Sequence, residues 1–188
     1  MSIHIAVAPV TDSPVQTWTI DPSHTHVEFS VRHMMVSTVK GRFPAVSGTI
    51  TLDDANLSRS TVDVDIAAAS VNTHDEQRDA HLRSADFFDA EVFPTLAFRS
   101  TQVEPLGEDR ARVSGELTIK DVTRPVVLEA ELNGRGTNPW GKQVIGFSAH
   151  TSINRKDFGL NWNVALEAGG VLVSDTIKIN LEVEATLA

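Results

Sequence analysis

The chain contains no cysteine and no tyrosine, and only 6% of its 188 residues are aromatic. Without cysteine there is no disulfide framework, no thiolate zinc or iron–sulfur site and no cysteine nucleophile. Basic residues are also few, with 16 Lys and Arg against 25 Asp and Glu and a formal net charge of -9. Because a nucleic-acid-binding protein needs clustered cations to neutralise phosphates, this composition argues against such a function.

Long hydrophobic runs are absent as well. No uninterrupted run of Ala, Val, Ile, Leu, Met, Phe or Trp exceeds four residues, whereas a bilayer-spanning helix needs about 20. The first Lys or Arg is Arg32, so the N-terminal stretch lacks the positively charged start of an export signal. We therefore expect a cytoplasmic protein with no transmembrane segment. Residues 1–16 are predicted to form a flexible tail and residues 17–188 a single domain.

Common catalytic signatures are missing too. The chain has no Gly-x-Ser-x-Gly elbow, no Gly-rich phosphate loop and no His-Glu-x-x-His zinc motif. We therefore predict no enzymatic activity, no catalytic residues and no cofactor.

What the chain does contain is period-2 alternation, which indicates strands with one buried face. The clearest run is residues 177–184, in which Ile177, Ile179, Leu181 and Val183 alternate with polar residues. Seven or eight antiparallel strands would commonly close into a barrel, because closure removes exposed sheet edges. The remaining alternating runs are residues 26–32, 49–52, 62–66, 96–99, 112–120, 126–133 and 145–153.

One segment breaks the alternation. Residues 73–85 begin with a capping box, Thr73 followed by Glu76, and contain no Gly or Pro, which predicts an α-helix. The predicted fold class is therefore all-β, an antiparallel barrel of about eight strands with one inserted helix. Its inward-facing residues are mostly Val, Ile, Leu and Ala. Such side chains fill a barrel poorly, which predicts an apolar cavity large enough for a ligand.

Seven histidines make a metal site worth considering. His24 and His26 are two residues apart on a predicted strand and are expected to share a face, a spacing that suits two imidazole ligands. Such a pair also commonly caps a turn or faces water, and no third ligand of recognised spacing accompanies it. We therefore predict no metal ion, and a metal-binding stress-related protein remains an alternative.

Two further groups could bind an anion. His74, Arg78 and His81 form one stripe on the predicted helix, where Arg78 could hold a phosphate or carboxylate with two hydrogen bonds. From the residues alone, a solvated helix face in which Asp75 and Asp79 pair with Arg78 and Arg83 fits the stripe better. Arg155 and Lys156 lie in a predicted turn directly after a strand, which is either an anion site or only a turn.

Several motifs occur in an order that resembles a known family. They are WTIDPSHTHVEFSVRH at residues 18–33, RDAHLRSADFF at residues 78–88, FPTLAF at residues 93–98 and INRKDFG at residues 153–159. Together they resemble the YceI family of lipocalin-like, polyisoprenoid-binding bacterial proteins. The resemblance implies an elongated barrel of about eight strands with an inserted helix. It also implies a homodimer whose barrel holds an isoprenoid or another long-chain amphiphilic lipid.

The same resemblance suggests which residues contact the lipid. Arg78, His81 and Arg155 match the polar motif positions and are expected at the head group, with His33 as a further candidate. The implied function is non-enzymatic binding or carriage of a polyprenyl phosphate, a quinone-type lipid or a related amphiphile. An enzyme acting on such a lipid is a second alternative. The residues expected to line the tail are Phe29, Phe43, Phe87, Phe88, Phe98 and Phe158.

Overall fold

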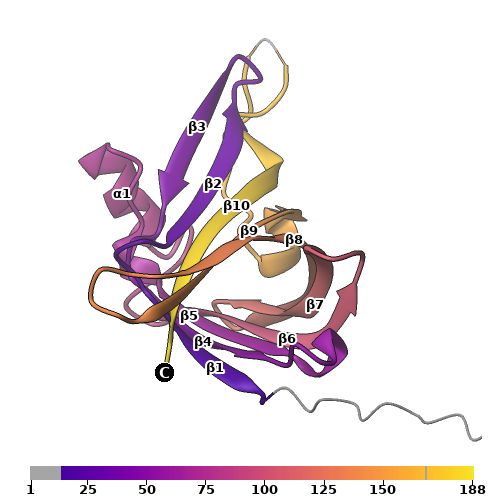
Figure 1. Cartoon of the computed structure of the whole chain (residues 1–188). Coiled ribbons are helices and arrows are strands. Elements are labelled where there is room, and N and C mark those ends of the chain that lie inside the picture. The colour runs from indigo at the N-terminus through magenta and orange to yellow at the C-terminus, as the bar shows by residue number, and fades with distance from the viewer. Residues whose placement is uncertain (1–13, 168) are drawn as a thin grey trace, which may run out of the picture.

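The computed structural model describes residues 14–167 and 169–188, which form one antiparallel sheet of ten strands, one α-helix and three short 3-10 turns (Figure 1). The helix is α1 (Glu76–Arg83), and the 3-10 turns are η1 (Leu57–Arg59), η2 (Ala68–Ser70) and η3 (Arg155–Phe158). The strands are β1 (Gln16–Ile20), β2 (His26–His33), β3 (Ser37–Arg42), β4 (Val46–Leu52), β5 (Thr61–Ala67), β6 (Thr95–Pro105), β7 (Arg110–Ile119), β8 (Val122–Thr137), β9 (Gln143–Asn154) and β10 (Val173–Leu187).

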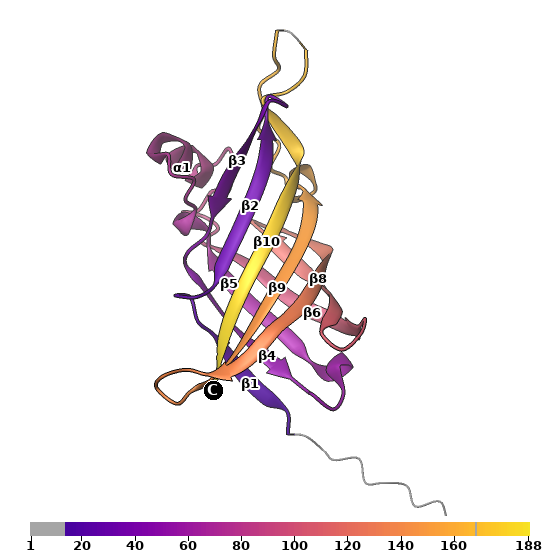
Figure 2. The ribbon, with the colours of Figure 1, turned by 45° about the horizontal axis from the view of Figure 1, so that its top comes forward.

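Eight strands close into a barrel in the order β1-β4-β5-β6-β7-β8-β9-β10, because β10 pairs with β1 as well as with β9. The last residues of β10, Ala185–Leu187, pair with Trp18–Ile20 of β1. The earlier part of β10, from Val173 to Glu182, pairs with β2. The β2–β3 hairpin therefore extends the sheet beyond the barrel as a wing (Figures 1 and 2). The predicted fold class, an all-β barrel of about eight strands with one helix, is confirmed.

The eight predicted strands correspond to β2 and β4 to β10, so two strands were missed. β1 has only five residues, and β3 contains a single large apolar residue, Val39. The number of barrel strands is as predicted, but the membership differs, since β1 belongs to the barrel and β2 belongs mainly to the wing. The predicted tail lies outside the described residues as far as residue 13, and Gln16 is already part of β1.

The helix is shorter than the predicted segment 73–85, and Thr73 does not cap it. Asp75 is the N-cap, and its carboxylate accepts a hydrogen bond from the backbone N–H of Arg78 at 3.0 Å. Thr73 instead donates its hydroxyl to the buried carboxylate of Asp79 at 2.6 Å. The prediction was wrong at the N-terminus because the helix begins after Asp75, whose carboxylate caps it, while the Thr73 hydroxyl oxygen accepts from the Nε–H of Arg78 instead of a backbone N–H.

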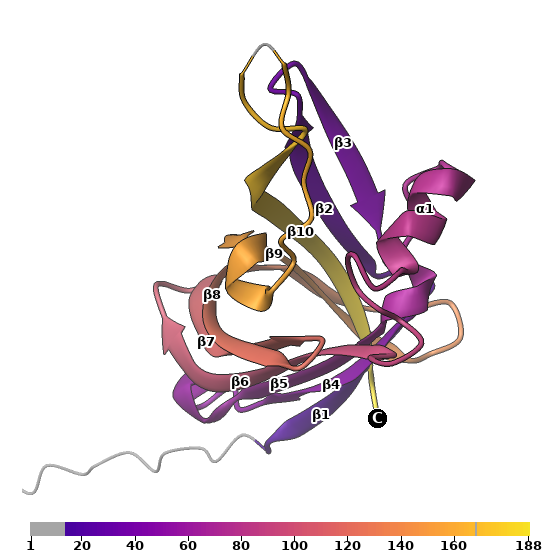
Figure 3. The ribbon, with the colours of Figure 1, turned by 180° about the vertical axis from the view of Figure 1, so that it is seen from behind.

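α1 and the segment that follows it lie beside β3, between the wing and the strands β4 to β6 (Figures 1 and 3). Leu82 of α1 and Phe88 of the following segment pack against the cluster that contains Phe43 and Val46. The helix side therefore supplies apolar side chains between the wing and the barrel, where β3 and β4 are not paired with each other.

A short plug, residues 155–163, crosses one end of the barrel. Its turn η3 contacts β8, β9 and β10, and its side chains Phe158 and Leu160 are buried in the same cluster as Phe43. In Figure 3, η3 is the short orange turn over the barrel. The plug closes this end with apolar residues of a single loop.

Arg155 fastens the plug to the start of β10. Its side chain is only 3% exposed, and all five of its N–H groups have acceptors. Burial lowers the pKa of this guanidinium from its ordinary value. The acceptors are the backbone oxygens of Ser174 at 3.0 Å, Leu160, Trp162 at 2.8 Å and Val173 at 3.3 Å, and the carboxylate of Asp175 at 3.5 Å.

Gly48 marks a close approach between β4 and β5. A Cβ atom at this position would overlap the carbonyl oxygen of Asp63 and lie 3.0 Å from the Cα atom of Val64. We expect Gly48→Ala to lower the free energy of unfolding by about 1–3 kcal/mol in urea denaturation. Gly136→Ala is the matched control, because its Cβ would meet nothing nearer than 3.8 Å. Equal stability of the two variants would contradict this packing.

Arg155→Lys should loosen the plug. Lysine offers three donors from a single nitrogen, so it cannot reach the acceptors that the planar guanidinium bridges. We expect a loss of about 3 kcal/mol in the free energy of unfolding, because several buried carbonyl groups lose a charged partner. Hydrogen exchange of the backbone amides of residues 157–163 should accelerate in this variant. Unchanged exchange would show that the apolar side chains hold the plug without Arg155.

Candidate functional site

The barrel encloses a cavity of about 450 Å³. Such a volume lies in the ordinary range of small-molecule binding sites. Every strand of the barrel and β2 of the wing contribute inward side chains to its lining, together with Leu82 of α1. These are the apolar members of the alternating runs, so the strand parity that buries them also builds the cavity wall. The prediction of an apolar cavity is therefore consistent with the structure.

A row of alanines accounts for part of the free space. Ala111, Ala130 and Ala149 are cross-strand neighbours on β7, β8 and β9, and all three line the cavity. Leu181 of β10 continues the same row. Three adjacent strands thus present only methyl groups at one level, where larger side chains would meet in the middle of the barrel.

Aromatic side chains form the wall beside α1. The ring centroids of Phe29 and Phe43 lie 5.6 Å apart, and those of Phe43 and Phe88 lie 5.4 Å apart in an edge-to-face arrangement. Phe87 and Phe98 also line the cavity. Five of the six phenylalanines predicted to contact a lipid tail therefore face the cavity.

Phe158 is the sixth of these predicted residues, and it does not appear in the cavity wall. Its side chain is 2% exposed and belongs to the core that the plug forms with the barrel. The structure thus places Phe158 in the plug and gives it a packing role there.

The cavity has polar residues at both of its ends. At the plug end the lining includes Arg155, whose donors are all engaged. The opposite end carries charged groups from the turns β4–β5 and β6–β7 and from β8. There Arg135 of β8 bonds both oxygens of Asp54, which links β8 to the turn after β4, a strand that is not its neighbour in the sheet. This bonding raises the pKa of Arg135.

The balance of charge at that opposite end is negative. Its four carboxylates outnumber its two guanidinium groups. This cluster was not predicted, because the alternation of apolar residues carries no information about charged groups in the turns. The signal available in the sequence was the pair of acidic turns at residues 53–54 and 108–109. The charged lining residues at this end are Asp54, Glu108, Asp109, Arg110, Glu131 and Arg135.

Arg78 lies outside the cavity wall. Its Nε–H donates to the hydroxyl of Thr73 at 2.7 Å, and its Nη2 donates to the backbone oxygen of Thr73 at 2.9 Å. A carboxylate oxygen of Asp75 lies 3.9 Å from Nη1. Arg78 therefore holds the chain that leads into α1, and its role at a lipid head group stays a prediction.

His81 connects α1 with the plug. Its ring packs edge-to-face against Phe87 at 5.1 Å and Trp162 at 4.7 Å between centroids, and its Nε2 lies 2.8 Å from a carboxylate oxygen of Asp86. His33 lies at the end of β2 opposite Val173. Neither histidine lines the cavity, so Arg155 is the one predicted head-group residue that does. The part played by Trp162 was missed, since no motif links it to the helix.

His24 and His26 do not share a strand face. His24 lies in the turn before β2, whereas His26 is the first residue of β2 and pairs with Glu182. The expectation that His24 and His26 share a strand face was therefore wrong, because the strand begins only at His26. His24 instead meets two carboxylates, with Nδ1 2.9 Å from Asp21 and 3.7 Å from Glu184.

Because His24 lies beside these carboxylates, the stability of this turn depends on pH. The hydrogen bond with Asp21 raises the pKa of His24 above its ordinary value of 6.5 and lowers the pKa of Asp21 below 3.8. Because the pKa of His24 is raised, its contribution to stability is present below pH 6.5 and is lost as the pH rises through the folded-state pKa. The contribution of Asp21 is present above pH 3.8 and is lost as the pH falls through its lowered pKa.

Among the described residues, no helix combines the length and apolarity that crossing a membrane requires.

The chain is similar to several known proteins. A UPF0312 protein of Staphylococcus aureus is 36% identical over 172 residues, which cover 91% of this chain and 98% of the relative. A UPF0312 protein of Pseudomonas putida is 37% identical over 161 residues, covering 86% and 80% of the two chains.

Solved structures share the architecture. The crystal structure of a Campylobacter jejuni YCEI protein is 36% identical with a TM-score of 0.71, covering 82% of this chain and 88% of that chain. A polyisoprenoid binding domain from Saccharophagus degradans has a TM-score of 0.70 at 16% identity, covering 92% and 99%. The YceI-like domain model matches residues 18–185, nearly the whole barrel and wing. This chain therefore belongs to the YceI-like domain family.

Proposed function

We propose that the protein binds one long-chain isoprenoid, or an amphiphile of similar shape, inside the barrel and acts as a carrier without catalysing a reaction. The observation that carries this proposal is the apolar cavity of about 450 Å³, which runs from the phenylalanine wall to the alanine row. Each methylene group buried there contributes about 0.8 kcal/mol. The shared fold with the polyisoprenoid binding domain of Saccharophagus degradans supports the same class of ligand.

The ends of the cavity favour a ligand with an uncharged head group. At the plug end, Arg155 has no free donor for a phosphate. At the other end, carboxylates outnumber cations, and Arg135 is committed to Asp54. A buried phosphate without paired cations is costly. An uncharged head group, such as a quinone or an alcohol, therefore fits these ends better than the phosphate of a polyprenyl phosphate.

The alanine row offers a direct test of where the chain of the lipid binds. Ala130→Phe places a phenyl ring into the cavity, and we expect it to weaken geranylgeraniol binding about tenfold, because the ring displaces several buried carbons. Affinity can be measured by displacement of the fluorescent fatty acid cis-parinaric acid. Val127→Phe is the matched control, since Val127 lies on the same strand but is exposed. Normal affinity in a folded Ala130→Phe variant would place the ligand elsewhere.

The head-group preference is tested with two ligands that share one tail. We expect geranylgeraniol to displace the fluorescent fatty acid about tenfold better than geranylgeranyl diphosphate, because the diphosphate lacks free cations in the cavity. Arg78→Ala should leave this ratio unchanged, since Arg78 lies outside the cavity wall and its Nε and Nη2 donate to Thr73. A preference for the diphosphate that disappears in Arg78→Ala would instead establish Arg78 as a head-group ligand.

A further inference from the structure

The hairpin of the wing ends in exposed aliphatic side chains. Met34, Met35 and Val36 are 44%, 64% and 80% exposed at the β2–β3 turn. Val164 and Val171 are exposed on the loop before β10, and the backbone N–H of Met34 donates to the carbonyl oxygen of Leu172 at 2.8 Å. Figures 1 and 2 show the hairpin turn and this loop side by side at one extremity of the molecule. We call these five residues the apolar tip.

The turn itself is an unusual place for methionine. Val36 N–H donates to the carbonyl oxygen of His33 at 3.0 Å, and the two residues between them, Met34 and Met35, have φ angles of 51° and 58°. Two successive positive φ angles are typical of a type I′ turn, which strongly prefers Asn and Gly. The chain therefore accepts backbone strain at a position where it presents two flexible apolar side chains to solvent.

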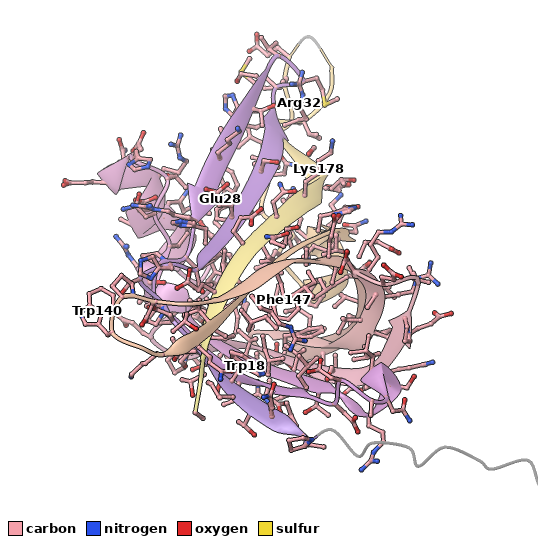
Figure 4. The ribbon with its side chains drawn as sticks, viewed as in Figure 1. Trp18, Glu28, Arg32, Trp140, Phe147 and Lys178 are labelled. Carbon is pink, nitrogen blue, oxygen red and sulfur yellow. The ribbon has the colours of Figure 1, made fainter. Side chains whose placement is uncertain are left out.

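Cations lie directly behind the apolar tip, on the outer face of the wing. Lys40 and Lys178 flank Ser30 in one cross-strand row. Arg32 lies one row nearer to the turn, and its guanidinium donates to the backbone oxygen of Met35 at 2.8 Å. Figure 4 shows Arg32 on β2 and Lys178 on the neighbouring strand β10. We call Arg32, Lys40 and Lys178 the cationic band, which stands out in a chain of net charge -9.

Acidic groups near the cationic band do not cancel it. Asp175 is bonded to Lys156 at 3.0 Å and also meets Arg155. Glu28 lies one row farther from the turn, between Arg42 and Asn180. Glu167 is an exposed carboxylate on the loop that carries Val164 and Val171. Glu28 and Glu167 are outnumbered by Arg32, Lys40 and Lys178, and these three cations are exposed next to the apolar tip.

We propose that the apolar tip inserts into the surface of a bilayer that contains anionic lipid, with the cationic band against the lipid head groups. Aliphatic side chains backed by Lys and Arg match the layered chemistry of a membrane interface. A methionine-rich surface suits the irregular boundary of acyl chains, because thioether side chains are flexible and polarizable. Aromatic anchors typical of protein interfaces are not part of the tip.

This docking deepens the proposed function and rests on it. Val173, which pairs with His33 immediately before the tip, lines the cavity, and so does Val31 two residues earlier on β2. Insertion of the tip would therefore bring the plug end of the cavity toward the membrane, from which a long-chain lipid has to come.

The absence of cysteine allows a clean measurement of insertion. The full chain carrying Val36→Cys is labelled with an environment-sensitive nitrobenzoxadiazole dye and mixed with vesicles of phosphatidylcholine, with or without phosphatidylglycerol. We expect a blue shift of dye emission with vesicles that contain phosphatidylglycerol. Val127→Cys, on the exposed face of β8, is the matched control and should show no shift.

Vesicle co-sedimentation of unlabelled protein separates the two parts of the tip. We expect Met35→Glu to weaken binding about tenfold, because it puts a charge into the inserted layer. Lys40→Gln should weaken binding to anionic vesicles about fivefold. Val127→Glu should bind as the unmodified chain does.

Three results would overturn the docking proposal. They are an unshifted dye at Val36→Cys, equal vesicle binding by Met35→Glu and Val127→Glu, and a change from dimer to monomer in Met35→Glu without vesicle binding by the parent chain. The last result would identify a second copy of the chain as the occupant of the tip. Geranylgeraniol binding in solution, measured on the same variants, keeps the two proposals apart. Vesicle binding through the tip without geranylgeraniol binding would overturn the cavity proposal alone.

Discussion

The structure depends on the pairing of β10 with three different strands. Over its fifteen residues this strand joins β9 along one side, and β2 and then β1 along the other. The contact with β1 closes the barrel, and the contact with β2 holds the wing. Because closure satisfies the backbone groups that an open sheet would expose, the short strand β1 is stable where an isolated five-residue strand would not be. The turn around His24 lies where β10 passes from one partner to the other.

Closure of the barrel does not by itself decide whether its interior is filled with side chains. Two features of the inward-facing side chains keep part of it hollow. Alanines occupy the same level of three adjacent strands, and Phe29, Phe43 and Phe88 pack against one another at the wall beside α1. Near the pairing of β1 with β10 the barrel is filled, since Trp18 and Ile145 pack there with Ala185. The barrel is therefore hollow at the cavity but closely packed where β1 pairs with β10.

The predicted site residues fall into two groups: apolar residues, whose position follows from the local sequence pattern, and polar residues, whose partners depend on tertiary contacts. Five phenylalanines face the cavity because strand parity and proximity to the helix largely decide where an aromatic residue points. The polar residues behave differently. Arg78, His81 and Arg155 each find partners inside the protein: a threonine, an aromatic pair and five acceptors around the plug. A motif shows that such residues occur together in the chain, but it does not show whether their donors remain free for a ligand.

The sequence by itself determined the all-β class, the position of eight strands, the presence of one helix and the apolar character of the interior, because each follows from local periodicity and capping. Only the tertiary structure decided that β1 rather than β2 closes the barrel, that Arg155 fastens a plug, and that Arg135 crosses the far end to Asp54. It also joined the β2–β3 turn to the loop before β10, through the hydrogen bond from the backbone N–H of Met34 to Leu172. These features join segments far apart in the chain, and their partners are selected by strand order and burial, which no local pattern encodes.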